Sequence, residues 1–398
     1  MFFFFGSINS KKTLSFQQLQ AMKIIIAPDK FKGSLTSFEV CDAIATGIKQ
    51  ADSSVEIFSF PMADGGDGFA SVLQHYYKTE TVYCDTVDPL YRKINATYQW
   101  NKVSKTAIIE MAVASGLVLL KAEERSATKT STFGTGMIIR NAIEKGADKI
   151  ILGLGGSATN DAGIGILAAL GFLFIDEGNN ELSPVGESLL YIKKIIAPRS
   201  LPGITIEIAL DVQNTLYGPQ GAAYIYAPQK GADEKAIKLL DEGLRNFAFI
   251  VQEQTGKDIS SIPGTGAAGG IAAGLLAFFD VILKKGIDMV IEASGIEKEI
   301  DNTNLIITGE GKMDKQTLDG KVVSKMAALA NERNIPVIAF CGISEESNLL
   351  KQRLNITHIE SLVSEGTTKE AAMNNGKNIL IKKAKQVYQN NFNVSNKD

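Results

Sequence analysis

A glycine turn followed by hydroxyl, amide and carboxylate side chains is the segment of this sequence best suited to hold an anion. The apolar run at residues 150–152 leads into a glycine-rich turn, and the polar residues 157–161 follow directly. Glycines let a backbone come close to a ligand, and free N–H groups at the start of a following helix suit phosphate. The candidate phosphate-binding residues are therefore Gly153, Gly155, Gly156, Ser157, Thr159 and Asp161.

Two other interpretations of this segment stay open. Gly153, Gly155 and Ala158 fit the pattern G-x-G-x-x-A, and Asp176 follows the apolar run at 172–175, as a dinucleotide-binding unit requires. A tight turn between a strand and a helix that binds no ligand has the same composition. The other polar loops of the chain must decide between these interpretations.

Two carboxylates stand in a glycine loop at residues 64–68. Asp64 and Asp67 follow the apolar run at 55–60 and are separated by two glycines. Carboxylates in such loops can hold hydrated Mg²⁺ beside phosphates, because Mg²⁺ takes oxygen ligands and keeps several waters. Asp and Gly are also favoured in exposed turns. Three glycines exceed what a simple turn needs, so we expect Asp64 and Asp67 to be metal ligands.

The densest polar cluster of the chain is at residues 308–321. Glu310 and Asp314 could each order a metal or abstract a proton, and Lys321 could reach a phosphate. The loop is not a Walker A motif, because Val322 follows the Gly-Lys pair and a lysine replaces the first glycine. The remaining candidate nucleotide-binding residues of this loop are Gly309, Gly311, Gln316 and Thr317.

A cationic loop and one further carboxylate complete the set. Asp29, Lys32 and Ser34 precede a predicted helix, where an ammonium group can neutralise a phosphoryl group or an anionic substrate. Asp211 directly follows a predicted strand and could serve as a general base or a metal ligand. Acidic glycine loops at several strand ends, with no Walker A motif, together favour phosphoryl transfer by positioning and electrostatics.

The elements that must position these loops predict an α/β fold. Strands expected at 23–27 and 55–60 flank an amphipathic helix that starts at Thr36, where Glu39 completes a capping box. Further strands are expected at 289–291, 305–308, 337–340 and near 358–363. These segments predict a doubly wound parallel sheet made by residues 22–78 plus 285–398, which binds ligands at its carboxyl edge.

Residues 79–284 are expected to form an inserted α/β domain with a mixed sheet. The predicted strands lie at 81–87, 94–100, 107–111 and 204–210, and a buried helix is expected over 271–283. A chain of 398 residues is longer than a single core usually supports. Residues 1–21 precede the first predicted strand and are expected to be a poorly ordered extension whose deletion leaves activity intact.

Composition argues against several classes of function. A net charge of −3 with no basic block argues against nucleic-acid binding, and the apolar stretch at 271–283 is too short to span a bilayer. Three cysteines stand far apart without a C-x-x-C pair, which argues against disulfides or structural zinc and indicates a cytoplasmic setting. The two histidines lie outside the polar loops, so serine-histidine hydrolysis is poorly supported.

Nine segments, in this order, resemble the type I glycerate kinase family, and the likeness extends from Met22 to about residue 365. The segments are 27–34 (APDKFKGS), 63–68 (ADGGDG), 110–117 (EMAVASGL), 133–136 (FGTG), 153–161 (GLGGSATND), 211–212 (DV), 228–232 (PQKGA), 266–270 (GAAGG) and 308–321 (TGEGKMDKQTLDGK). Departures from the family pattern include Lys30 for a serine, Asp67 for a glutamate, Tyr91 for a glycine and Met137 for an acidic residue.

The resemblance implies ATP-dependent, Mg²⁺-dependent phosphorylation of D-glycerate in a cleft between a flavodoxin-like domain and the inserted domain. Lys32 or Arg92 would hold the substrate carboxylate, and Asp211 or Asp314 would accept the hydroxyl proton. The remaining roles implied are substrate binding by Asp29, Ser34 and Asn160, metal binding by Asp64, Asp67 and Glu310, and phosphate binding by the glycine turn and Lys321.

Two rival functions and several finer points stay open on the sequence. A NAD(P)-dependent oxidoreductase would use residues 153–176, and a non-catalytic regulator would bind sugar acids without ATP turnover. The 2-hydroxyl is favoured over the 3-hydroxyl as the site of phosphorylation. The chain is expected to act as a monomer or homodimer, without a membrane or nucleic-acid partner.

Overall fold

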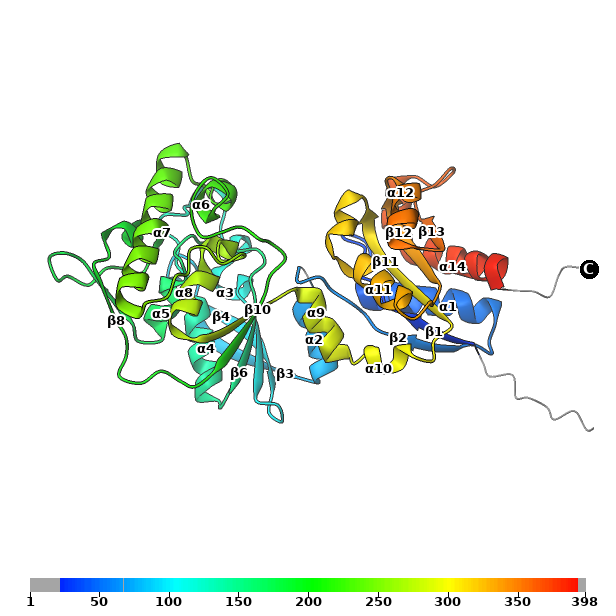
Figure 1. Ribbon diagram of the computed structural model, residues 1–398, viewed down its shortest axis with the longest axis horizontal. Coiled ribbons are helices and arrows are strands. Elements are labelled where there is room, and N and C mark those ends of the chain that lie inside the picture. Colours follow the sequence, from blue (N-terminus) through cyan, green and yellow to red (C-terminus); the bar gives the residue numbers. More distant parts are fainter. Residues whose placement is uncertain (1–21, 67, 393–398) are drawn as a thin grey trace, which may run out of the picture.

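Two sheets, each with its own helices, form two lobes that lie side by side in the computed structural model (Figure 1). The structure describes residues 22–66 and 68–392, so the prediction for residues 1–21 lies outside it. Both chain ends fold into one lobe, and the middle of the chain forms the other. The exact domain boundaries at 78/79 and 284/285 stay a prediction.

The first sheet is built from segments near the two chain ends. Its five strands are all parallel and stand in the order β13-β12-β11-β1-β2. Their bounds are β1 Lys23–Ile26, β2 Glu56–Ser59, β11 Leu305–Met313, β12 Val337–Ser344 and β13 His358–Ser361. The predicted doubly wound parallel sheet is confirmed, and its switch point lies between β1 and β11, where the chain winds off in opposite directions.

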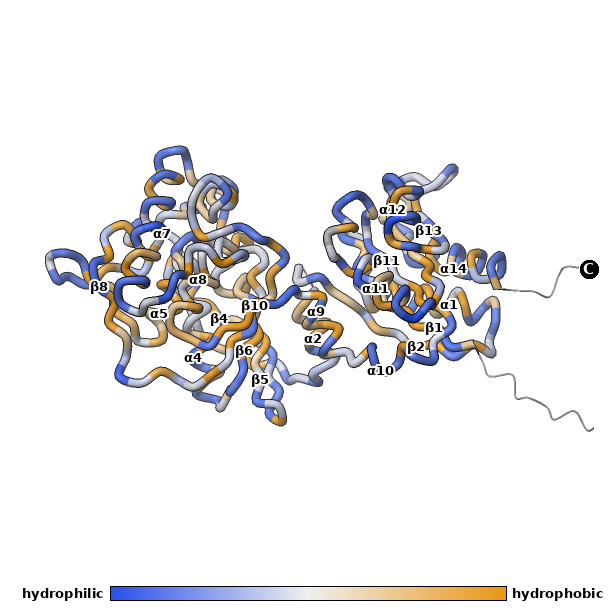
Figure 2. The backbone as a smooth tube through the Cα atoms, viewed as in Figure 1, coloured by the Kyte–Doolittle hydropathy of each residue, from blue (hydrophilic) through white to orange (hydrophobic). Residues whose placement is uncertain are grey.

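Helices cover both faces of this sheet, because successive residues of a strand point to opposite sides. Ile24 and Ile26 belong to an apolar cluster with α1 and α14, whereas Ile25 belongs to one with α11 and α12. Figure 2 shows hydrophobic residues along the strands of this lobe. The helices are α1 Ser37–Ala51, α11 Val322–Asn331, α12 Ser347–Leu354, α13 Lys369–Asn374 and α14 Gly376–Phe392.

The predicted capping box at the start of α1 is confirmed. Glu39 donates its N–H to the Thr36 hydroxyl, and the Thr36 N–H donates to the Glu39 carboxylate. Further along α1, Gly47 permits close packing against α14, because a Cβ there would lie 2.3 Å from the Ile381 carbonyl oxygen.

The second sheet is mixed and has six strands in the order β10-β9-β6-β5-β4-β3. The strands β10, β9, β6 and β5 run parallel, and β4 and β3 are antiparallel to their neighbours. Their bounds are β3 Glu80–Val87, β4 Lys93–Asn101, β5 Thr106–Glu110, β6 Lys149–Gly153, β9 Thr205–Ala209 and β10 Asp280–Lys284. The predicted mixed sheet of the middle region is therefore confirmed.

The helices of this lobe pack on the mixed sheet in one large apolar cluster. They are α3 Ala112–Ser115, α4 Phe133–Glu144, α5 Ile164–Ala169, α6 Ala222–Tyr226, α7 Glu234–Thr255 and α8 Ile271–Phe278. A separate antiparallel pair, β7 Leu173–Ile175 and β8 Lys194–Ile196, lies beside them.

Two helices lie between the lobes, α2 Phe69–Tyr77 and α9 Gly286–Ser294 (Figure 1), followed by the short α10 Glu297–Ile300. Phe69 of α2 shares a buried cluster with Ile108 and Ile151 of the mixed sheet and with residues of the parallel sheet. The Glu110 carboxylate also accepts the N–H of Ala70 at 3.2 Å. These contacts join the two sheets through apolar packing and one polar cap.

Two predicted elements are wrong. Residues 289–291 are not a strand but part of α9, where a short apolar run is buried against α2, and such runs do not distinguish helix from strand. The helix predicted over 271–283 ends at Phe278, and β10 follows and pairs with β9. The β-branched pair Val281 and Ile282 favours the strand.

Among the described residues, no helix is both long and apolar enough to cross a bilayer.

We expect Ile306→Ala to lower the free energy of unfolding by about 2–5 kcal/mol, because Ile306 is fully buried at the centre of the parallel sheet and its loss leaves a cavity. Chemical denaturation measures the change. The matched control Val103→Ala removes a side chain that is 96% exposed and should change stability by less than about 0.5 kcal/mol. Equal stabilities for the two variants would contradict this account of the core.

Candidate active site

Three adjoining cavities follow one another between and beside the lobes. The largest, the charged chamber, has a volume of about 630 Å³, and the glycine chamber and the apolar chamber have about 320 and 210 Å³. The charged chamber is lined by Asp29, Lys30, Lys32, Asp64, Gly66, Gly155, Gly156, Glu310, Gly311, Lys312, Asp314, Gln316, Thr317, Lys321, Ile343 and Lys369. The first two volumes fall within the usual range for ligand pockets.

The other two chambers share walls with the charged chamber. The glycine chamber is lined by Gly65, Gly66, Leu117, Leu154, Gly155, Gly156, Ser157, Ala209, Leu210, Asp211, Val212, Tyr226, Gln229, Ala267 and Ala268. The apolar chamber is lined by Phe31, Lys32, Ser34, Gly311, Gly342, Ile343, Leu362, Val363, Lys369, Ala372 and Met373. Residues distant in the sequence thus meet in one continuous space.

Strand ends of both sheets deliver the polar groups to this space. The loops after β1 and β2 carry Asp29 and Asp64, and Glu310 lies within the long strand β11. From the other lobe, the turn after β6 carries Gly155 and Gly156. The charged chamber therefore lies at the carboxyl edge of the parallel sheet, beside its switch point, where open α/β sheets bind ligands.

The acidic groups of the charged chamber are held close together and largely out of water. Asp29 and Glu310 are 6% and 7% exposed. Burial, with the charge of Asp64 adding to it, raises the pKa of Asp29 to about 7 against the opposing charge of Lys30. Burial likewise raises the pKa of Glu310 to about 7, although the Thr317 hydroxyl donates to its Oε1 at 2.5 Å and Lys321 lies near. A cation would stabilise the ionised forms of these carboxylates.

Asp211 is placed where it meets the same groups from the other lobe. It follows β9 and lines the glycine chamber. Partial desolvation and the charge of Asp64 raise its pKa to about 6, while Lys321 and Lys285 oppose this shift. The two connections between the lobes pack closely here. Gly65 has φ of +110°, and a Cβ on Gly286 would lie only 2.4 Å from the Cα of Gly65.

Lysines supply the positive charge of the charged chamber. Among the described residues, Lys32, Lys321 and Lys369 form no ion pair, and Lys30 lies 3.9 Å from Asp29. Unpaired ammonium groups gathered in one cavity suit an anion with several negative oxygens. Lys369 was missed from the sequence, because a lysine at the first position of the short helix α13 carries no motif that distinguishes it from a surface lysine.

The glycine turn lies between the charged and glycine chambers and offers backbone donors to both. Gly156 has φ of +72°, which favours glycine. Within the described residues, the N–H groups of Gly155, Gly156 and Ser157 have no hydrogen-bond acceptor. This part of the turn therefore keeps the features predicted for an anion site.

One buried lysine fixes the shape of this turn. Lys230, which is 1% exposed, donates to the Ser157 hydroxyl at 2.8 Å and to the Thr159 carbonyl oxygen at 2.6 Å. Burial lowers its pKa to about 7, although Asp161 opposes the shift. The segment PQKGA that contains Lys230 was the only sequence signal for this role, and it was a weak one.

The second half of the glycine segment lies inside the protein. Asp161 is fully buried and accepts the Thr132 N–H and hydroxyl, each at 2.8 Å, and the N–H groups of Gly163 and Gly165. Thr159 and Asn160 are also fully buried, and the Asn160 amide has no hydrogen-bond partner among the described residues. None of these three side chains lines the chambers, and Gly153 is buried within β6.

The geometry also corrects the expected helix after the turn. The helix α5 begins only at Ile164, and the N–H of its residue Gly165 points to Asp161. The dinucleotide interpretation fails for the same reason, since no helix opens at the turn. In addition, the Asp176 carboxylate accepts the Asn180 N–H in an exposed loop after β7.

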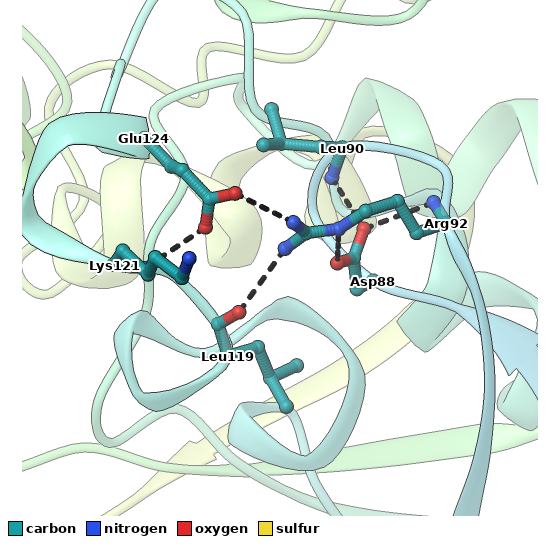
Figure 3. A network of polar contacts seen from close by, with 6 residues as sticks. All are labelled: Asp88, Leu90, Arg92, Leu119, Lys121 and Glu124. Atoms are coloured by element: carbon teal, nitrogen blue, oxygen red, sulfur yellow. Dashed lines mark hydrogen bonds and ion pairs between the residues drawn. The ribbon is translucent and has the colours of Figure 1, made fainter.

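Arg92 does not reach the chambers. Figure 3 shows its guanidinium held by the carboxylates of Asp88 and Glu124 and by the Leu119 carbonyl oxygen. The Asp88 carboxylate also accepts the N–H groups of Leu90 and Arg92. The cation is therefore committed to a structural network, and of the two residues predicted to bind a substrate carboxylate Lys32 alone lines the charged chamber.

Some of the remaining candidate residues line a chamber, and others are engaged in contacts with the backbone. Asp314 lies at the chamber wall, but its carboxylate pairs with Lys312 at 3.0 Å and accepts the Gln316 N–H, which lowers its pKa. Ser34 donates to the Met373 carbonyl oxygen. Gly309 is buried in β11, where a Cβ would lie 2.2 Å from the Phe340 carbonyl oxygen. Gly311, Gln316 and Thr317 line the charged chamber, and their binding of a nucleotide stays a prediction.

The donor set fits Mg²⁺ that arrives with phosphates better than an independent metal site. Within the described residues, no three carboxylate, histidine or cysteine side chains are grouped to hold a metal by themselves. Mg²⁺ usually takes one or two carboxylates together with substrate phosphates and water. Asp64 and Glu310 can supply such ligands, whereas Asp67 lies outside the described residues and its role stays a prediction.

The fold and the site define a two-lobed α/β protein whose cleft combines carboxylates with free lysines, the arrangement of a phosphotransferase. Residues 24–391 match the glycerate kinase family. The chain is 40% identical to glycerate 2-kinase of Escherichia coli over 88% of this chain and 93% of that protein, and 40% identical to a glycerate kinase of Bacillus cereus over the same shares. A crystal structure from Salmonella typhimurium LT2, assigned to glycerate kinase 2, superposes with a TM-score of 0.83 at 35% identity and covers 93% of this chain and 98% of its own. The chain belongs to the glycerate kinase family.

We expect the free energy of unfolding of the wild type to increase, relative to that of Lys230→Met, as pH rises from about 7 toward 10. The pKa of Lys230 in the folded protein, about 7, lies below its ordinary 10.5. Over that window the unfolded chain binds more protons, so deprotonation favours the folded wild type.

Urea denaturation of both proteins between about pH 6 and 9 measures this difference. The exposed residue in Lys235→Met provides the matched control, for which no such slope is expected. A stability difference for Lys230→Met that stays constant with pH would contradict a desolvated ammonium at this position.

Proposed function

We propose that this protein catalyses the ATP-dependent phosphorylation of D-glycerate and that the product is 2-phosphoglycerate. The observation that carries the proposal is the charged chamber, which brings Asp29, Asp64 and Glu310 together with lysines at the carboxyl edge of the parallel sheet. Membership of the glycerate kinase family supports the substrate. The name of the Escherichia coli relative, glycerate 2-kinase, supports the 2-hydroxyl as acceptor.

In this proposal, the nucleotide phosphates lie in the charged chamber between the glycine turn and the lysines. The N–H groups of Gly155 and Gly156 and the ammonium of Lys321 face this space and would stabilise negative charge on the transferring group. Asp64 and Glu310 would hold Mg²⁺, which when bound neutralises phosphate charge.

Asp211 is the general base in this proposal. Its pKa of about 6 leaves it mostly ionised near neutral pH yet more basic than an ordinary aspartate. It lies on the lobe opposite Glu310 and next to the glycine turn, so an acceptor hydroxyl in the glycine chamber could reach both the base and the phosphates. Asp314, by contrast, is engaged by Lys312 and caps a turn.

Placing the reacting groups on two lobes also gives water exclusion a structural basis. Asp211 and the glycine turn come from the mixed sheet, whereas Asp64, Glu310 and Lys321 come from the lobe with the parallel sheet. An approach of the lobes around the substrates would bring these groups together and remove water that could otherwise hydrolyse ATP.

A coupled assay of ADP release with D-glycerate, with and without Mg²⁺, tests the proposal. We expect turnover that depends on both glycerate and Mg²⁺. Binding of glycerate without any ADP release would instead indicate a non-catalytic sugar-acid regulator and overturn the proposal. Analysis of the product by NMR separates 2-phosphoglycerate from 3-phosphoglycerate and tests the regiochemistry independently.

We expect Asp211→Asn to lower kcat by about 10²–10⁴-fold, because the amide cannot accept the hydroxyl proton. Asp314→Asn should lower kcat by less than about 10-fold, since Asp314 is paired with Lys312 and serves as a cap. Steady-state kinetics measures both, and circular dichroism checks that both variants fold. A larger loss in Asp314→Asn than in Asp211→Asn would reverse the assignment of the base.

A further inference from the structure

We propose that the apolar chamber binds the adenine ring of ATP and that the glycine chamber binds glycerate, so that nucleotide and acceptor lie on different lobes. This inference rests on the proposed kinase function and assigns its two substrates to separate subsites. Its basis is the order of the three chambers, which is apolar, then charged, then a small chamber that contains the base. The same order describes a purine, a triphosphate and an acceptor hydroxyl.

Continuity of the cavities supports the nucleotide half of the inference. The apolar and charged chambers share Lys32, Lys369, Gly311 and Ile343 as lining residues. The two lysines form no ion pair within the described part of the chain, and they stand where the phosphates of a nucleotide would leave its nucleoside. Charge and apolar surface are thus arranged for a ligand with an apolar ring and an anionic chain.

The walls of the apolar chamber fit a flat aromatic ring. Phe31 and Leu362 are buried side chains at its base, whereas Met373 is 42% exposed although it is apolar. Methionine adapts to irregular surfaces and makes favourable contacts with aromatic rings. A volume of about 210 Å³ is smaller than a pocket for a whole drug-sized ligand, which suits one part of a larger molecule.

Two glycines let the backbone segments that line this chamber pack closely. A Cβ at Gly311 would lie 2.9 Å from the backbone nitrogen of Lys32, and a Cβ at Gly342 would lie 2.6 Å from the Gly311 carbonyl oxygen. The strands β11 and β12 and the loop after β1 therefore approach closely without side chains between them. The space in front of this close packing remains free for a ligand.

The glycine chamber suits the acceptor rather than the adenine ring. It contains the Asp211 carboxylate, which as the proposed general base must contact the acceptor hydroxyl. It also borders Ser157, whose N–H has no acceptor within the described residues and can donate a hydrogen bond to the carboxylate of glycerate. Gly155 and Gly156 of the mixed-sheet lobe line both this chamber and the charged chamber, so a hydroxyl bound here would lie beside the phosphates.

Three matched valine-to-tryptophan variants test the assignment. Val363→Trp fills the apolar chamber, Val212→Trp fills the glycine chamber, and Val103→Trp adds the same ring at a site that is 96% exposed and lines none of the three chambers. Val363 and Val212 are each half-buried, so a larger side chain can project into the cavity. Steady-state KM values for ATP and for D-glycerate are measured for each folded variant.

We expect Val363→Trp to raise the KM for ATP at least about 10-fold with little change for glycerate, and Val212→Trp to do the reverse, since blocking a pocket removes about 1.4 kcal/mol or more of binding. Val103→Trp should match the wild type. The inference is overturned if the two effects are exchanged, or if neither variant changes either constant.

A binding measurement separates the adenine ring from the phosphates. Calorimetry with the full chain should show weaker binding of MgADP to Val363→Trp, but unchanged binding of magnesium pyrophosphate, which lacks the ring. Equal weakening of both probes would place phosphates, and not adenine, in the apolar chamber and would overturn the inference. If the wild type releases no ADP with glycerate while it still binds MgADP, the proposed function fails and the adenine subsite is judged by binding alone.

Discussion

The close grouping of carboxylates, two of them buried, at one edge of the cleft is the constraint on which this site depends. Burial raises the pKa of Asp29 and Glu310, partial desolvation raises the pKa of Asp211, and the charge of Asp64 adds to each shift. Such a cluster is costly in free energy unless positive charge is present to balance it. Lys321, which lies near all three, supplies part of that charge from the protein. In the proposed function, a Mg²⁺ ion held by Asp64 and Glu310 would add further positive charge.

The arrangement of the two sheets brings these carboxylates together. Both sheets direct the carboxyl ends of parallel strands toward the cleft, and α2 and α9 hold the sheets together through one apolar cluster. The backbone contact between Gly65 and Gly286 brings the two connections between the lobes within van der Waals distance. Acidic side chains from separate segments can then share one space without being neighbours in sequence.

The glycine turn illustrates how a buried residue can support an exposed one. Gly155 and Gly156 present their backbone to the cleft, while Lys230 and Asp161 hold the following residues inside the mixed-sheet lobe. A segment that reads as one motif is thus divided into a ligand-facing half and a structural half. Arg92 shows the opposite case, because a cation that matches the substrate in charge is fully engaged by Asp88 and Glu124.

The sequence by itself determined the fold class, the capping box of α1, and the loops that carry Asp29, Asp64 and Glu310, because alternating patterns and glycine-acidic turns are local properties. It did not determine the state of 289–291 or the end of α8, since short apolar runs satisfy a helix and a strand equally well. Only the tertiary structure separated Asp211 from Asp314 and Lys32 from Arg92. Within each pair the two side chains carry the same charge, and their ion pairing and their position relative to the chambers differ because both depend on what folds next to them.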